Sequence, residues 1–166
     1  IVKMTTNLMR DLGSIPSPQN SFYLGIGLET LHLRMERHYE NALALAKHLE
    51  KHPKVAWVSF SGLEKDSQHA LAKKCLPNGS CGVISFGVVG GREAAVKFMD
   101  SLKLAAIVTH VADSRTCVLH PASTTHRQMN DEELLAAGVS PDLIRMSVGI
   151  EDIQDLIQDV DQALGK

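Results

Sequence analysis

Residues 82–88 read Gly-Val-Ile-Ser-Phe-Gly-Val, a run in which large apolar side chains alternate with small or polar ones. Ile84, Phe86 and Val88 fall on one face of an extended chain, and the residues between them fall on the other. Because successive side chains point to opposite faces of a strand, this alternation predicts a strand with one buried face. Such a strand needs helices or a second sheet to cover that face.

The segments on either side supply further strands and the helices that could cover them. Further β-type runs are expected at residues 55–60, 106–111, 115–119 and 143–148. Apolar residues at helical spacing predict helices over residues 66–75, 92–102, 131–137 and 153–164. One long helix, or two nearly continuous ones, is predicted from Ser17-Pro18 to His52-Pro53. We therefore predict an α/β fold, a small two-layer sandwich of about four or five strands in a largely antiparallel sheet covered by helices.

Composition excludes several classes of protein. The 166 residues are 44% hydrophobic and 22% charged, as in a globular chain, and the net charge of -2 lacks the basic excess of a nucleic-acid binder. No apolar run reaches the ~20 residues of a membrane span, so no membrane partner is expected. Three cysteines without a CxxC spacing argue against a disulfide framework or a metal site and favour the cytoplasm. The chain begins at Ile1 rather than at methionine, and we expect it to be a piece of a longer protein.

Arg145 is the residue that points most directly to function. It is the one charge in the apolar run 143–148, and a permanent cation beside a sheet core is costly unless an anion accompanies it. The anion could be an internal carboxylate or a substrate carboxylate, since a guanidinium binds either in bidentate fashion. The alternative is an edge-strand arginine that faces water. The pattern leaves all three readings open.

Histidines and hydroxyls give weaker signals. His110 ends a β-like run just before a turn, where side chains often face a cleft, and is a candidate site residue. The polar loop 120–126 has neither a nucleophile-elbow pattern nor a zinc-ligand spacing, so its hydroxyls are expected to satisfy its own turns. His32 and His38 lie among charged residues and are expected on the surface. The cysteines are expected to be buried or incidental thiols.

Four long stretches resemble one enzyme family in their order and spacing. They are residues 27–63, 69–91, 113–129 and 138–164, and they include HPASTTH (120–126) followed by PDLIRMSVGIED (141–152). They are similar to the C-terminal part of the enzymes of cysteine and methionine metabolism that use pyridoxal phosphate. Within that family the chain looks most like the O-acetylhomoserine sulfhydrylases. Cystathionine γ-synthase, the cystathionine lyases and methionine γ-lyase are the alternatives.

The resemblance implies a domain organisation. Residues 1–52 would be a connecting segment and long helix, and residues 53–166 the small C-terminal domain of a type I aminotransferase-like fold. Pyridoxal phosphate would be held on a lysine of a large domain that is missing here, because the family's Ser-x-Thr-Lys pattern has no counterpart in this chain. The resemblance thus implies that this chain contains no catalytic, cofactor-binding or metal-binding residue, and that it is inactive alone.

The resemblance also implies roles for three residues. Arg145 matches the arginine that receives the α-carboxylate of the substrate, Thr124 matches a region that lines the active site, and His110 aligns where relatives often carry Ser or Asn near the substrate. The full-length enzyme, a homotetramer, would replace the acetate of O-acetylhomoserine with sulfide or methanethiol, giving homocysteine or methionine. This chain would supply substrate-carboxylate recognition and closure of the active site.

Two readings from other classes accompany this one. In the first, the chain is a free-standing α/β small-molecule-binding module in which Arg145 recognises carboxylates without chemistry. In the second, it is an interaction domain whose exposed first helix binds a partner. The long motifs favour the enzyme family over both.

Overall fold

The computed structural model describes residues 1–13 and 15–165. The chain forms two compact units, and the boundary between them in the sequence lies between Leu33 and Arg34. The first unit contains a π-helical turn η1 (Met4–Met9), a short helix α1 (Arg10–Leu12) and helix α2 (Pro18–Glu29). Ser17 begins α2 as expected, because its hydroxyl accepts the backbone N–H of Asn20 at 3.1 Å. The prediction of two nearly continuous helices is confirmed, since the next helix begins two residues after Glu29.

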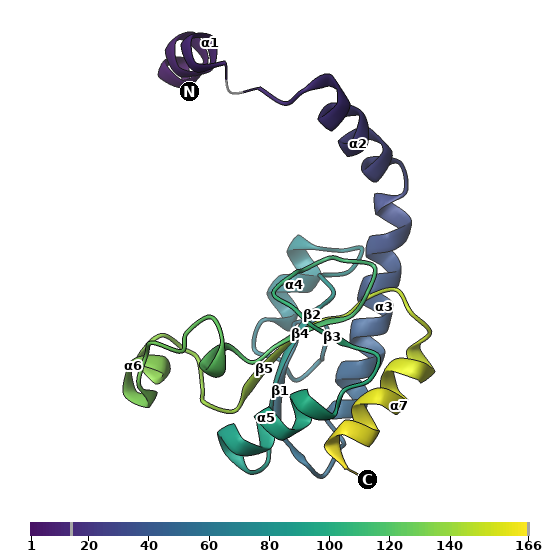
Figure 1. The fold of residues 1–166 in the computed structure, drawn as a ribbon. Helices are drawn as coiled ribbons and strands as arrows, with labels where there is room; N and C mark the ends of the chain where they lie inside the picture. The colour runs from purple at the N-terminus through teal and green to yellow at the C-terminus, as the bar shows by residue number, and fades with distance from the viewer. Residues whose placement is uncertain (14, 166) are drawn as a thin grey trace. The chain divides into compact units, whose positions relative to one another are not determined.

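The second unit is built on one sheet of five strands (Figure 1). Its strands are β1 (Val55–Ser59), β2 (Val83–Val88), β3 (Ala106–Ile107), β4 (Cys117–Leu119) and β5 (Leu143–Ser147). They lie in the order β1-β2-β5-β4-β3, and each neighbouring pair is antiparallel except β3 and β4, which are parallel. The predicted α/β class and largely antiparallel sheet are confirmed. The run expected to be extended over 106–111 is wrong beyond Ile107, because the chain leaves the sheet in a loop there.

Helices cover the face of the sheet that the sequence predicted. The covering helices are α3 (Leu31–Leu49), α5 (Gly91–Ser101) and α7 (Ile153–Leu164). The unit also contains α4 (His69–Cys75), the 3-10 turn η2 (Pro121–Ser123) and α6 (Asp131–Ala136). Ile84, Phe86 and Val88 of β2 belong to one core with buried residues of α3, α5 and α7. Among the described residues, no helix has the length and apolar character needed to cross a lipid bilayer.

His38 corrects one expectation from the sequence. Its side chain is 2% exposed rather than on the surface, and its Nδ1 lies 2.6 Å from the carbonyl oxygen of Val148, to which it donates. Asn41, one turn later on α3, donates to the carbonyls of Gly149 and Glu151 at 3.0 and 2.9 Å. These two polar residues therefore attach α3 to the backbone that follows β5. His32 is exposed as expected.

Asp159 of α7 holds the segment between α5 and β3. The carboxylate is 6% exposed and accepts the backbone N–H groups of Lys103, Leu104 and Ala105 at 2.8, 3.0 and 3.0 Å. Three consecutive N–H groups would otherwise be buried or poorly solvated without a partner, which is costly. Asp159 therefore fixes where the chain enters β3.

Gly87 makes room for a contact that crosses β2. The indole N–H of Trp57 on β1 donates to Asp142, just before β5, at 3.0 Å. A Cβ at Gly87 would lie 2.0 Å from the Asp142 carboxylate and 2.1 Å from the Trp57 indole nitrogen. A side chain at position 87 would therefore break the bridge between the strands on either side.

We predict that Asp159→Ala lowers the free energy of unfolding by roughly 2–4 kcal/mol, because three backbone donors lose their acceptor. Urea unfolding of the purified chain, followed by circular dichroism, measures the change. Asp155→Ala, an exposed carboxylate on the same helix, is the matched control and should change stability by under about 1 kcal/mol. Equal losses for the two variants would contradict this role for Asp159.

Candidate functional site

Arg145 lies in the middle of the sheet. β5 is flanked by β2 and β4, and Arg145 is paired with Ser85 on one side and Leu119 on the other. These partners share the face opposite to the core formed by Ile84 and Phe86, because directly paired residues point to the same side. Arg145 is half-buried. The edge-strand reading of this arginine is therefore wrong.

The guanidinium of Arg145 is oriented by a backbone carbonyl. Its Nη2 donates to the carbonyl oxygen of Thr109 at 2.9 Å. Within residues 1–13 and 15–165, no carboxylate lies within ion-pair distance of Arg145, so the internal-carboxylate reading finds no support there. A guanidinium has five N–H donors in a planar fork that matches a carboxylate. Arg145 can therefore bind an external carboxylate while Thr109 holds its plane.

Thr109 belongs to a loop, residues 108–116, that is tied to the end of β5. The backbone N–H of Ala112 donates to the hydroxyl of Ser147 at 3.0 Å, and that of Ile150 donates to the carbonyl of Ser114 at 2.9 Å. Ala112 has φ of 58°, in the left-handed region that a residue with a Cβ rarely adopts. The loop is thus fixed by tertiary hydrogen bonds rather than by local preference.

Glu151 closes the same loop at its far end. Its carboxylate accepts the backbone N–H of Thr116 at 2.6 Å and the Thr116 hydroxyl at 2.9 Å, and that hydroxyl accepts the N–H of Gly149. A Cβ at Gly149 would lie 2.3 Å from the Glu151 carboxylate and 2.4 Å from the carbonyl oxygen of Ser114. The segment after β5 can pass this close to the loop because residue 149 is glycine.

Asp113 and Arg115 form an ion pair on the loop. The side chain and the backbone N–H of Arg115 both donate to the Asp113 carboxylate, at 3.1 and 3.0 Å for the closest contacts. These hydrogen bonds hold the pKa of Asp113 at about 2, below its usual 3.8. Asp113 is therefore ionised at neutral pH and gives the loop a negative charge next to Arg115.

His110 is exposed and follows Thr109 directly in the chain. The hydrogen bond between Thr109 and Arg145 therefore brings the backbone of His110 close to the guanidinium. No hydrogen bond of its side chain is found among the described residues. A role for His110 in substrate binding stays a prediction.

Thr124 lies in a separate loop that His120 organises. The buried His120 ring donates from Nε2 to the carbonyl of Pro141 and accepts the Ser123 hydroxyl at Nδ1, both at 2.8 Å. The Thr124 hydroxyl donates to the carbonyl of His120 at 2.8 Å. These hydroxyls satisfy their own turn, as the sequence predicted, and His120 ties the loop to the start of β5. The substrate-binding role of Thr124 stays a prediction.

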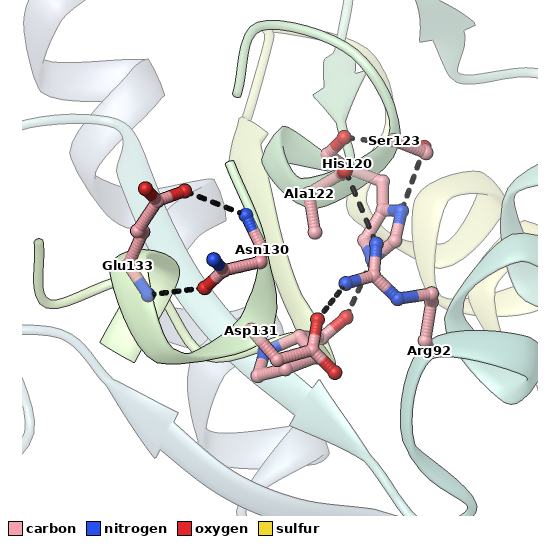
Figure 2. Close-up of polar contacts among 8 residues, drawn as sticks. Arg92, His120, Ala122, Ser123, Asn130, Asp131 and Glu133 are labelled. Atoms are coloured by element: carbon pink, nitrogen blue, oxygen red, sulfur yellow. Dashed lines mark hydrogen bonds and ion pairs between the residues drawn. The ribbon is translucent and has the colours of Figure 1, made fainter. Parts of the chain in front are cut away.

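Arg92 at the start of α5 fastens the next stretch of the chain. It donates to the carbonyl of Ala122 at 3.2 Å and forms an ion pair with Asp131, the first residue of α6 (Figure 2). Asn130 caps α6 through reciprocal hydrogen bonds with Glu133, both at 2.9 Å. The sequence predicted this helix, but it gave no signal for the ion pair, whose two residues are 39 positions apart.

Sequence reasoning missed Ser147, Thr116 and Glu151. A serine two residues after Arg145 on an apolar strand shares its face, and that spacing was the available signal for Ser147. Thr116 and Glu151 lie 35 residues apart, and nothing in either local pattern joins them.

The thiols and potential metal ligands add no further chemistry. Burial raises the pKa of the Cys117 thiol, which keeps it protonated and unreactive, whereas Cys75 and Cys81 are exposed. In the described part of the chain, no three His, Cys, Asp or Glu side chains are grouped so that they could hold a metal ion.

Comparison with known proteins gives a consistent result. The family model described as "Cys/Met metabolism PLP-dependent enzyme" matches residues 1–165. The chain is 55% identical to a homocysteine synthase from Schizosaccharomyces pombe, covering 96% of this chain and 37% of that protein. It is 44% identical to an O-acetyl-L-homoserine sulfhydrylase from Leptospira meyeri, covering 99% of this chain and 37% of the relative.

A solved structure agrees with these sequences. The crystal structure, from Campylobacter jejuni, is described as an O-acetylhomoserine (thiol)-lyase with a pyridoxyl-lysine phosphate. The two chains are 37% identical with a TM-score of 0.90, and the match covers 99% of this chain and 39% of the other. The chain thus spans about two-fifths of the length of the proteins it matches.

We predict that the Asp113 carboxyl titrates near pH 2, and that Arg115→Gln moves its pKa towards 3.8, because the hydrogen bonds from Arg115 favour the ionised form. The folded-state pKa lies below the unfolded one, so the stabilising contribution is present above pH 3.8 and is lost as the pH falls towards 2. Carboxyl carbon shifts measured by NMR against pH give both values. A midpoint near 3.8 in the unsubstituted chain would contradict this assignment.

Proposed function

The chain belongs to the Cys/Met metabolism PLP-dependent enzymes, and from that premise we propose that it is the C-terminal part of an O-acetylhomoserine sulfhydrylase. The proposed reaction of the whole enzyme replaces the acetate of O-acetylhomoserine with sulfide or methanethiol, giving homocysteine or methionine. The names of the relatives support this choice, since they include a homocysteine synthase and an O-acetyl-L-homoserine sulfhydrylase. The task of this chain is to bind the α-carboxylate of the substrate and to help close the active site.

The observation that carries the proposal is the setting of Arg145. It is a half-buried cation on a central strand whose described partner is a neutral carbonyl, Thr109. A cation in such a place is favourable when an anion completes its hydrogen bonds. A bidentate carboxylate fits the planar fork and fixes the orientation of the amino acid relative to the reacting atoms.

We assign supporting roles to Thr124 and His110. His110 directly follows Thr109, whose carbonyl accepts the hydrogen bond that orients Arg145, so its exposed side chain is placed to meet a bound amino acid. Thr124 is exposed in a loop that His120 ties to the carbonyl of Pro141, two residues before β5 begins. Both lie on segments that are joined to the strand of Arg145.

The residues around Arg145 do not fit the cofactor itself. Its contacts and strand partners are Thr109, Ser85 and Leu119, and none of them is a lysine. Because the Ser-x-Thr-Lys pattern is also missing from this chain, pyridoxal phosphate, which supplies the electron sink for amino-acid chemistry, is proposed to be held on a lysine outside it. In this proposal the chain contributes no catalytic residue, binds no cofactor by itself and is inactive alone.

The proposal extends to the organisation of the whole protein. Residues 1–52 would connect to the large cofactor domain, and residues 53–166 would form the small domain beside it. The large domain is the principal partner, and the whole enzyme would be a cytoplasmic homotetramer.

We predict that, in the full-length enzyme that contains these residues, Arg145→Ala raises KM for O-acetylhomoserine roughly 10- to 150-fold, because a charge-assisted hydrogen-bonded pair is lost. The KM for sulfide should stay within about twofold, since the thiol does not bind Arg145. Steady-state assays of homocysteine formation measure both constants. Arg37→Ala, an exposed arginine on α3, is the control, and an unchanged KM in Arg145→Ala would overturn the proposed role.

We also predict that the 166-residue chain alone forms no stoichiometric adduct with pyridoxal phosphate. Absorbance titration, borohydride reduction and mass spectrometry for a pyridoxyl-lysine measure this. One saturable, singly modified lysine would mean that the chain has a cofactor site of its own. The proposal that the cofactor lysine lies elsewhere would then be wrong.

A further inference from the structure

We propose that Ser147 is a positioning residue for the substrate carboxylate, acting through the loop that orients Arg145. Its hydroxyl holds the backbone of Ala112, and the loop so held presents the carbonyl of Thr109 to the guanidinium. This inference rests on the proposed function of Arg145. It adds the contact that keeps the guanidinium oriented for the substrate carboxylate.

Ser147 is placed for this task by the alternation of β5. It follows Arg145 by two residues, so both side chains leave the same face of the sheet. Ser147 is 2% exposed, and a buried hydroxyl needs a hydrogen-bond partner. The partner is the N–H of Ala112, at 3.0 Å, and Ala112 is a loop residue that precedes Ser147 by 35 positions in the chain.

The conformation of Ala112 indicates that tertiary contacts hold the loop at the residue that Ser147 binds. A residue with a Cβ at φ of 58° is disfavoured, and such a conformation persists when its surroundings determine it. The other described ties of the loop, at Ser114 and Thr116, lie on the C-terminal side of Ala112. On the N-terminal side, Thr109 is held by Arg145 itself. Residues 109–112 are therefore fastened to β5 at Arg145 and at Ser147.

The two fastenings support each other. Thr109 fixes one N–H of a planar guanidinium and hence the plane of the whole fork. Without Ser147, the loop can leave, and Arg145 regains rotamer freedom that the bound substrate must then remove. Binding of the carboxylate weakens for that reason, although Arg145 is still present.

The test uses the full-length enzyme that contains these residues and measures KM and kcat for O-acetylhomoserine. Ser147→Ala should raise KM about 5- to 30-fold, the cost of ordering one long side chain and its loop, and leave kcat within about twofold. Ser147→Thr keeps the hydroxyl and should recover most of the loss. Ser101→Ala, which removes another hydroxyl with one hydrogen bond at the end of α5, should leave KM unchanged.

A double-substitution cycle separates positioning from a general structural effect. If Ser147 acts through Arg145, Ser147→Ala adds little to KM in an Arg145→Ala background, so the two effects are not additive. If Arg145→Ala raises KM and Ser147→Ala does not, or if their effects simply multiply, this inference is wrong while the proposed function stands. If Arg145→Ala leaves KM unchanged, the proposed function itself fails.

Discussion

The pairing of β5 with both β2 and β4 is the constraint on which the rest of the domain depends. One face of β5 completes the core through Ile144 and Met146, which are fully buried, and the other face carries Arg145 and Ser147. Because side chains alternate along a strand, the register that buries the first pair also fixes the second. A slip of one residue would put the guanidinium into the core. Burial of Ile144 and Met146 in the core thus fixes the strand register that places Arg145 on the opposite face.

The segments around β5 are held to it by hydrogen bonds that run between distant parts of the sequence. His38 and Asn41 bind the backbone after the strand, His120 binds the backbone before it, and Glu151 captures Thr116. Most of these contacts join a side chain to a backbone group, so they fix the path of the chain and not only the packing of its side chains. The chain on both sides of β5 is consequently tied to other elements through its backbone.

Local sequence patterns predicted much of this fold. The alternation at 82–88 identified the buried face of β2, and the spacing of Ile153, Leu156 and Val160 identified the side of α7 that meets the core. They failed where a polar residue has a distant partner. His38 looked like a surface residue because its sequence neighbours are charged, but its partner is the carbonyl of Val148, 110 residues away. Arg145 could be singled out because it is the one charge in its own apolar run. The loop that orients it could not, because Thr109 lies 36 residues away in the sequence.

Trp57 gives the domain an optical reporter. It is the one tryptophan of the chain, and its indole N–H reaches over Gly87 to the carboxylate of Asp142, the residue before β5. The emission of an indole depends on the polarity of its surroundings and on nearby charge. Its fluorescence therefore registers whether the start of β5 is seated, without any added label. The same signal allows the central strand to be followed separately from the helices, whose folding is seen in the far-ultraviolet circular dichroism.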